Sequence, residues 1–125
     1  MLYFKCDIMK LINSSFIEEK KSKFYGYLYE IDNKDEIDNI LKIVKESNKG
    51  YRHIPYAYKL FNTAGKTNDK EPGDIGMNFL KTLEYNNLNS HLLLVVRYFG
   101  GTKLGASNLT RIYSKCARCC INNNN

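Results

Sequence analysis

The residues from Arg97 to Arg111 combine glycines, polar side chains and positive charges in the order that an anion site needs. An apolar stretch leads into Gly100-Gly101, and a helical pattern begins after Gly105. Glycines let the backbone approach a ligand closely, and unpaired amides at a helix N-terminus attract negative charge. The spacing matches neither the phosphate loop nor the dinucleotide fingerprint, so a purely architectural turn is the alternative. The candidate anion- or nucleic-acid-binding residues are Arg97, Gly100, Gly101, Lys103, Gly105, Ser107, Asn108, Arg111, Lys115 and Arg118.

Positive charge is concentrated in the same part of the chain. The net charge is +6, residues 51–125 hold ten Lys or Arg against four Asp or Glu, and no acid follows Glu84. A surface of one sign attracts phosphate-rich or acidic partners, although a solvated basic surface is the simpler alternative. On a helix beginning near Gly105, the basic residues 111, 115 and 118 share one face. This pattern predicts RNA contact, with Tyr98 or Phe99 available to stack on a base.

Three further residues could form an acid–base site if the fold brings them together. These are His53, Glu71 and Arg97, which come from separate segments. Histidine and glutamate are common acid–base partners in enzymes. However, His53 begins an apolar stretch typical of a structural histidine, and Arg97 has the alternative role of pairing with Glu71. With no nucleophile beside a base, His53 and Glu71 are weak catalytic candidates and an enzyme is the less favoured interpretation.

The four cysteines do not have the spacing of a metal site. Cys116, Cys119 and Cys120 lie within about one helical turn, and Cys6 is far away in the sequence. Cys116 and Cys120 are four residues apart, which places both on one helix face, so burial is favoured over metal or redox chemistry. We therefore predict no metal and no cofactor. Reduced cysteines and the absence of an apolar run longer than five residues predict a cytoplasmic protein without a membrane segment.

The elements that must position these residues can be read from periodicity. Apolar residues recur at helical spacing in three segments, each preceded by a capping or helix-opening residue: Asn33, Asp74 and Gly105. Residues 16–31 read as two strands joined near Lys20 to Ser22, or as one strand with a polar entry. Further strands are expected at 54–61 and 91–96, and a polar loop at 63–73. The run at 91–96 is apolar on both faces, as in a central strand.

This order predicts an α+β fold. We expect a two-layer sandwich, with a mixed sheet of four or more strands and helices mainly on one face. The length of 125 residues suits one domain, at residues 1–121, followed by a disordered asparagine tail at 122–125. Hydrophobic and charged contents of 43% and 26% are those of a globular chain.

Read whole, the motifs resemble those of the IMPACT family. Residues 97–113 match its Arg-Tyr-Phe-Gly-Gly-x-Lys-Leu-Gly signature and the Leu-x-Arg-x-Tyr that follows. The segment 53–58 resembles its His-x-x-x-Ala-Tyr strand, residues 71–76 its Glu-Pro turn, and residues 22–24 its Ser-Lys/Arg-Phe strand. The Glu-Pro turn is one residue shorter here, with Asp74 and Ile75 where the family has Thr and Ala. Asn108 stands in place of a glycine.

The resemblance carries expectations about fold and function. It implies the fold of a small-subunit ribosomal protein domain and of domain IV of a translocating elongation factor. It also implies a translation-associated binding module that contacts RNA or the ribosome. A protein-binding adaptor in translation-stress signalling, with translation-factor partners, is the first alternative, and a small enzyme using His53, Glu71 and Arg97 is the second. Family members often carry a companion domain, for which this chain has no room.

Overall fold

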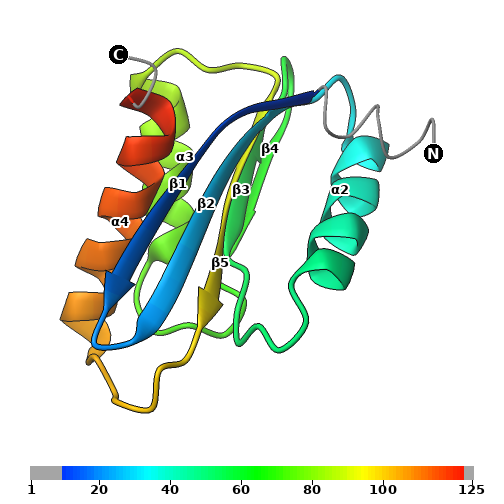
Figure 1. Cartoon of the computed structure of the whole chain (residues 1–125). Helices are drawn as coiled ribbons and strands as arrows, with labels where there is room; N and C mark the ends of the chain where they lie inside the picture. Colours follow the sequence, from blue (N-terminus) through cyan, green and yellow to red (C-terminus); the bar gives the residue numbers. More distant parts are fainter. Residues whose placement is uncertain (1–9, 123–125) are drawn as a thin grey trace.

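The computed structural model describes residues 10–122 (Figure 1). Its elements are β1 (Leu11–Glu19), β2 (Ser22–Glu30), α2 (Lys34–Ser47), β3 (Tyr56–Lys59), β4 (Ala64–Thr67), α3 (Ile75–Tyr85), β5 (His91–Tyr98) and α4 (Ala106–Asn122). Asn122 is the last residue of α4 rather than the first of a tail. The rest of the predicted tail, and Cys6, lie outside the described residues.

The five strands form one sheet in the order β1-β2-β5-β3-β4, and every neighbouring pair is antiparallel. The predicted α+β class is therefore confirmed, but the predicted mixed sheet is wrong. The reason is the position of β5, which lies between β2 and β3 and runs antiparallel to both. Helix α2 connects β2 to β3. These two strands run in the same direction but do not pair, because β5 lies between them.

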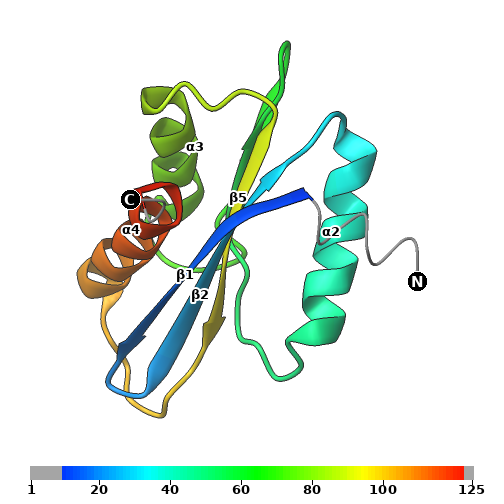
Figure 2. The same cartoon turned by 45° about the horizontal axis from the view of Figure 1, so that its top comes forward.

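Helices cover both faces of this sheet, so the molecule has three layers rather than the predicted two (Figure 2). Helices α3 and α4 pack on one face, as the prediction of helices mainly on one face anticipated, and α2 packs on the other. The arrangement is required because successive side chains of β5 point to opposite faces of the sheet and are apolar on both. Leu93 and Val95 point toward α3 and α4, whereas Leu92, Leu94 and Val96 point toward α2. Leaving either set in water would cost about 1.5–3 kcal/mol for each large side chain.

Strands β1 and β2 form a hairpin, which decides between the two alternatives left by the sequence. Strand β1 begins at Leu11, five residues before the predicted start, and Lys20 and Lys21 make the turn with φ of 48° and 69°. The polar loop expected at 63–73 contains the short edge strand β4 instead. Its four residues alternate between exposed and half-buried and contain no large apolar side chain, so periodicity offered no signal for it.

The predicted helix caps have different outcomes. Asn33 caps α2 as predicted, since its side chain accepts a hydrogen bond from the Glu36 amide. Asp74 occupies the N-cap position of α3 but makes no side-chain cap bond. Asn68 supplies that contact instead: its Oδ1 accepts from the Gly76 amide at 2.7 Å, and its Nδ2 donates to the Gly73 carbonyl at 2.8 Å.

Within the described residues, no helix is both long and apolar enough to cross a membrane.

Cys116 and Cys120 are buried where α4 crosses the β1–β2 hairpin. Their sulfur atoms lie 3.3 and 3.2 Å from the Ser15 hydroxyl, which donates to the Cys116 carbonyl at 2.7 Å. Gly26 makes this contact possible, because a Cβ there would lie 2.7 Å from Cys120 Sγ and 2.5 Å from Ser15 Oγ. Burial is the main cause that raises the pKa of Cys116 to about 12 and of Cys120 to about 11.

These two thiols should resist alkylation in the folded protein. At pH 8, far below both pKa values, almost no reactive thiolate forms, and the reagent cannot reach the buried sulfurs. We expect iodoacetamide to label the half-buried Cys119 within minutes and to label Cys116 and Cys120 only after urea is added. Peptide mass spectrometry distinguishes the three sites. Equal labelling of all three without urea would contradict the burial of the helix face.

Candidate functional site

The glycine-rich segment lies where β5 ends and α4 begins. Gly101 and Gly105 have φ of 100° and 82°, in the left-handed region that favours glycine, and Gly105 directly precedes α4. The amide of Leu109 donates to the Gly105 carbonyl at 2.9 Å, which begins the helical hydrogen bonds. The amides of residues 106–108 are therefore those of a helix N-terminus. The predicted strand–turn–helix arrangement is confirmed.

A cavity of about 310 Å³ opens beside this turn. Three of the four segments that resemble family motifs meet in it, because its lining comes from the residues just before β3, the Glu-Pro turn, the end of β5 and the start of α4. The lining residues are Arg52, His53, Glu71, Pro72, Arg97, Phe99, Lys103, Leu104, Gly105, Ala106 and Leu109. Tertiary structure thus brings the candidate acid–base residues and the glycine-rich segment into one place.

A buried ion pair forms the floor of the cavity. Arg97 Nη1 donates to both carboxylate oxygens of Glu71, at 2.9 and 2.8 Å, and only 8% and 2% of the two side chains are exposed. The Tyr113 hydroxyl donates a hydrogen bond to the same carboxylate. Burial, followed by the charge of Glu71, raises the pKa of Tyr113 far above its usual value, so the phenol remains a donor. The Glu71–Arg97 pairing ties the Glu-Pro turn to β5.

His53 lies beside the Glu71–Arg97 ion pair. Its Nε2 is 3.7 Å from Glu71 Oε1, and its backbone bridges to Arg97, whose amide donates to the His53 carbonyl at 2.9 Å. Among the hydrogen bonds of the described residues, none connects His53 to a serine, threonine or cysteine. The cluster is thus a network of ion pairs and hydrogen bonds without the nucleophile–base pair of covalent catalysis.

Cations surround the mouth of the cavity. The Arg52 guanidinium lies over the Phe99 ring at 4.7 Å from its centroid, and the Lys103 side chain is exposed. In the part of the chain that the structure describes, Arg97 Nε is buried without a hydrogen-bond partner. Because Glu71 already neutralises Arg97, the remaining charge at the mouth is positive, in keeping with an anion site at the start of α4.

Not every predicted anion-binding residue is available to a ligand in the cavity. The Gly100 amide donates to the Ser22 hydroxyl at 3.0 Å, so it supports the turn. Asn108 Oδ1 accepts from Arg111 Nε and Nη2 at 3.3 and 2.9 Å, which orients the arginine. Ser107 is exposed on the first turn of α4. Gly100 and Gly101 therefore have different roles. The Gly100 amide holds the turn against Ser22, and Gly101 adopts the positive φ that the turn requires.

The other predicted basic residues lie on α4, outside the lining of the cavity. Arg111, Lys115 and Arg118 are all exposed, on the side opposite the buried stripe of that helix. Together with Lys103 they form what we call the basic face. In the described residues, no carboxylate lies within ion-pair distance of these four side chains.

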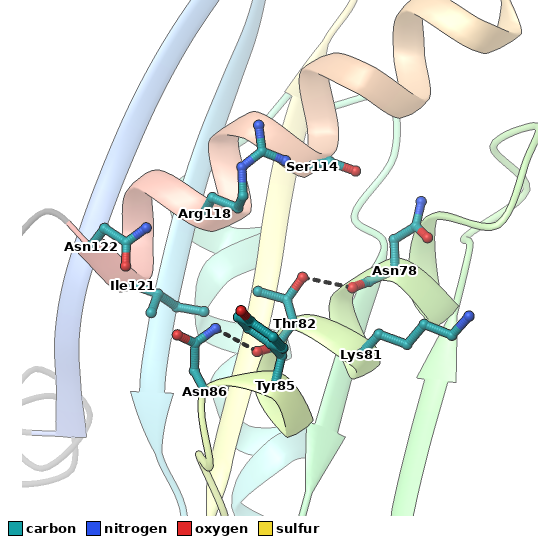
Figure 3. Close-up of a pocket in the computed structure, with 9 residues that line it drawn as sticks. All are labelled: Asn78, Lys81, Thr82, Tyr85, Asn86, Ser114, Arg118, Ile121 and Asn122. Carbon is teal, nitrogen blue, oxygen red and sulfur yellow. Dashed lines mark hydrogen bonds between the residues drawn. The ribbon is translucent and has the colours of Figure 1, made fainter.

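A second hollow, which the sequence analysis missed, lies between α3 and α4 (Figure 3). This α3–α4 groove measures about 460 Å³ and includes Arg118 of the basic face. Its lining residues are Asn78, Lys81, Thr82, Tyr85, Asn86, Ser114, Arg118, Ile121 and Asn122. Only the packing of two helices distant in sequence creates it, so no local motif could have revealed it.

The predicted stacking residues lie on different surfaces. Phe99 is 38% exposed beneath Arg52, whereas the Tyr98 hydroxyl donates to Asn48 Oδ1 at 3.1 Å on the α2 side of the sheet. Tyr98 belongs to a row of rings there, with Tyr25 at 5.9 Å and then Phe16 at 4.9 Å between centroids.

Within residues 10–122, no group of three His, Cys, Asp or Glu side chains is arranged to hold a metal ion.

Comparison with known proteins places this geometry in a family. The family model described as the Impact N-terminal domain matches residues 20–121. The IMPACT family member YvyE of Bacillus subtilis is 33% identical over 100 residues, which cover 77% of this chain and 46% of that protein. A solved structure described as a hypothetical protein has a TM-score of 0.82 at 25% identity, covering 87% of this chain and 56% of the other.

The structure of the two-domain translational regulator Yih1 has the same fold, with a TM-score of 0.52 at 17% identity over 90% of this chain and 46% of that one. Fold and site together define a small α+β domain with a glycine-turn cavity and a basic C-terminal helix. The chain belongs to the IMPACT family, which confirms the resemblance of its motifs. It spans 30–50% of the length of the curated relatives that it matches.

Proposed function

We propose that this chain is a translation-associated binding module that contacts RNA, including that of the ribosome, through its basic face. Membership of the IMPACT family and the shared fold of the translational regulator Yih1 support a translation-related role. The observation that carries the RNA contact is the basic face itself: four exposed cations on a segment without a single acid. Phosphate contacts supply most of the affinity of such surfaces, whatever the nucleotide sequence.

The cavity at the glycine turn supports the same proposal. A phosphate there would meet the helix N-terminus of α4, the positive charges of Arg52 and Lys103, and the unpartnered Nε of Arg97. Each of these favours an anion by hydrogen bonding or by charge. Because Lys103 belongs to both the cavity and the basic face, one RNA backbone could contact both surfaces.

Removing the charges of the basic face should weaken RNA binding in a salt-dependent way. We expect the triple variant Lys103→Ala, Arg111→Ala and Lys115→Ala to reduce the slope of log affinity against log salt by about 2, at roughly 0.7 for each single-strand phosphate contact. Filter binding across a salt series measures the slope. Co-sedimentation with ribosomal subunits in low and high salt tests the same contact on the ribosome.

A matched variant controls for total charge. Lys42, Lys45 and Lys49 are exposed on or just after α2, which covers the opposite face of the sheet. Replacing these three lysines by alanine removes the same charge and should leave the salt slope unchanged. Equal losses for both triple variants would show that net charge alone attracts RNA, and no binding by the native chain in low salt would exclude the proposal.

A protein-binding adaptor is the second candidate, and one observation favours it. The ring row of Phe16, Tyr25 and Tyr98 crosses three neighbouring strands, and Phe16 is 51% exposed. Exposed contiguous aromatic side chains are typical of protein-binding surfaces. Protein partners that remain bound after nuclease treatment would favour this function over RNA binding.

A further inference from the structure

The α3–α4 groove has a lining that differs from the apolar contact between the two helices beneath it. Phe79 and Leu83 of α3 and Tyr113 of α4 are buried in the core, whereas polar side chains stand above them along the groove. Figure 3 shows the lining residues on two sides of the hollow: Ser114, Arg118 and Ile121 belong to α4, and the other side consists of α3 and the residue after it, with Asn78, Lys81, Thr82, Tyr85 and Asn86.

The groove is positively charged. Lys81 and Arg118 are the ionised groups in its lining, and no carboxylate belongs to it. Among the residues that the structure describes, neither cation has an acidic partner; Glu84, the acid on the same helix, contacts Lys59 at 3.7 Å instead. Two cations at one concave site attract an anion more strongly than isolated surface charges do.

Tyr85 gives the groove an aromatic surface. Its side chain is 87% exposed although it stands at the C-terminal end of α3, beside a concavity that could have buried it. An exposed ring beside cations is the usual arrangement for stacking a nucleobase. Polar groups lie within the same hollow: Asn86 Nδ2 donates to the Thr82 carbonyl at 2.8 Å, which orients its amide, and Thr82 Oγ1 donates to the Asn78 carbonyl at 2.7 Å.

We propose that the α3–α4 groove binds one unstacked nucleotide of a single-stranded RNA segment. The base stacks on Tyr85, the amides of Asn78 and Asn86 meet its hydrogen-bonding edge, and Arg118 and Lys81 hold the adjoining phosphate. The volume of about 460 Å³ is within the range of small-ligand sites. This inference rests on the proposed function, and it adds that the RNA is read as an open single strand rather than as a duplex, whose bases cannot reach the ring.

The test compares binding of a fluorescently labelled single-stranded RNA of mixed sequence with binding of a duplex of the same length. Loss of one stacked base lowers affinity by roughly 5- to 150-fold. We expect Tyr85→Ala to weaken single-strand binding by such a factor without changing the salt slope, and Tyr85→Phe to bind as the native chain does. Arg118→Ala should weaken binding and reduce the salt slope by about 0.7. Duplex binding should not respond to Tyr85→Ala.

Phe61→Ala provides the matched control, since Phe61 is 92% exposed and lies in the β3–β4 turn, outside the groove. It should bind both RNAs as the native chain does. If Tyr85→Ala binds single strands normally while the Lys103, Arg111 and Lys115 variant is impaired, the groove proposal is wrong and the proposed function stands. If the native chain binds no RNA, both are wrong. Equal loss with Tyr85→Ala and Tyr85→Phe would assign the effect to the hydroxyl and overturn the stacking contact.

Discussion

Replacing Glu71 by glutamine should lower the free energy of unfolding by about 3–5 kcal/mol, the usual cost of leaving one charge of a buried pair without its partner. The Arg97 side chain is 8% exposed, and its Nη1 donates to both oxygens of the Glu71 carboxylate. The substitution keeps the shape of the side chain but leaves the guanidinium charge uncompensated in the core. Thermal unfolding followed by circular dichroism should show a loss of roughly 10–20 °C in Tm.

Two further variants separate the ion pair from other effects. Glu84→Gln removes an exposed carboxylate that contacts Lys59 at 3.7 Å, and it should cost less than about 1 kcal/mol. Combining Glu71→Gln with Arg97→Met removes the stranded charge, so the double variant should recover about 1–3 kcal/mol relative to Glu71→Gln alone. If Glu71→Gln were as stable as Glu84→Gln, the pair would not be what holds the Glu-Pro turn against β5.

The second large effect should come from Gly100. A Cβ at this position would lie 2.2 Å from the carbonyl carbon of Lys21 and 2.3 Å from the Ser22 amide nitrogen, both of which are backbone atoms. Gly100→Ala must therefore push the glycine turn away from the β1–β2 hairpin and break the bond from its amide to Ser22 Oγ. We expect a loss of about 3 kcal/mol, at the upper end of the cost of overpacking.

Gly101 provides the comparison, because it is adjacent but faces open space. No atom lies within 4 Å of a Cβ built there, and its φ of 100° makes alanine unfavourable by about 1–2 kcal/mol. Urea unfolding measures the two stability losses, and hydrogen exchange at the amides of Lys21 and Ser22 locates them. Faster exchange at these amides in Gly100→Ala but not in Gly101→Ala is the expected result. The same exchange in both variants would contradict the close contact between turn and hairpin.

The elements of this fold were predictable where one local pattern decides the structure. Ile37, Ile40 and Val44 recur at helical spacing after a capping Asn33, and α2 follows them closely. The glycines between β5 and α4 similarly mark a turn that few other residues could make. In contrast, β4 contains no large apolar side chain that could mark it as a strand, and the cap of α3 comes from Asn68, which lies six residues before the expected Asp74.

The candidate site was predictable in part. The motifs indicate the segments that meet in the cavity, and the pairing of Arg97 with Glu71 is one of the two roles that the sequence suggests for Arg97. The role of each residue within the site could not be predicted, because it depends on contacts between residues far apart in the sequence. The amide of Gly100 is engaged by Ser22, 78 residues earlier, and the carboxylate of Glu71 by Tyr113, 42 residues later.

By itself, the sequence determined the family of this protein, its class of fold and the location of its positive charge, because each depends on residue identities and local spacing. Tertiary structure alone decided which side chains share a site. The position of β5 between β2 and β3 made the sheet antiparallel, and the two apolar faces of β5 required a third layer. The packing of α3 against α4 created the groove around Tyr85 and Arg118, since a concave surface needs two elements whose approach no local pattern specifies.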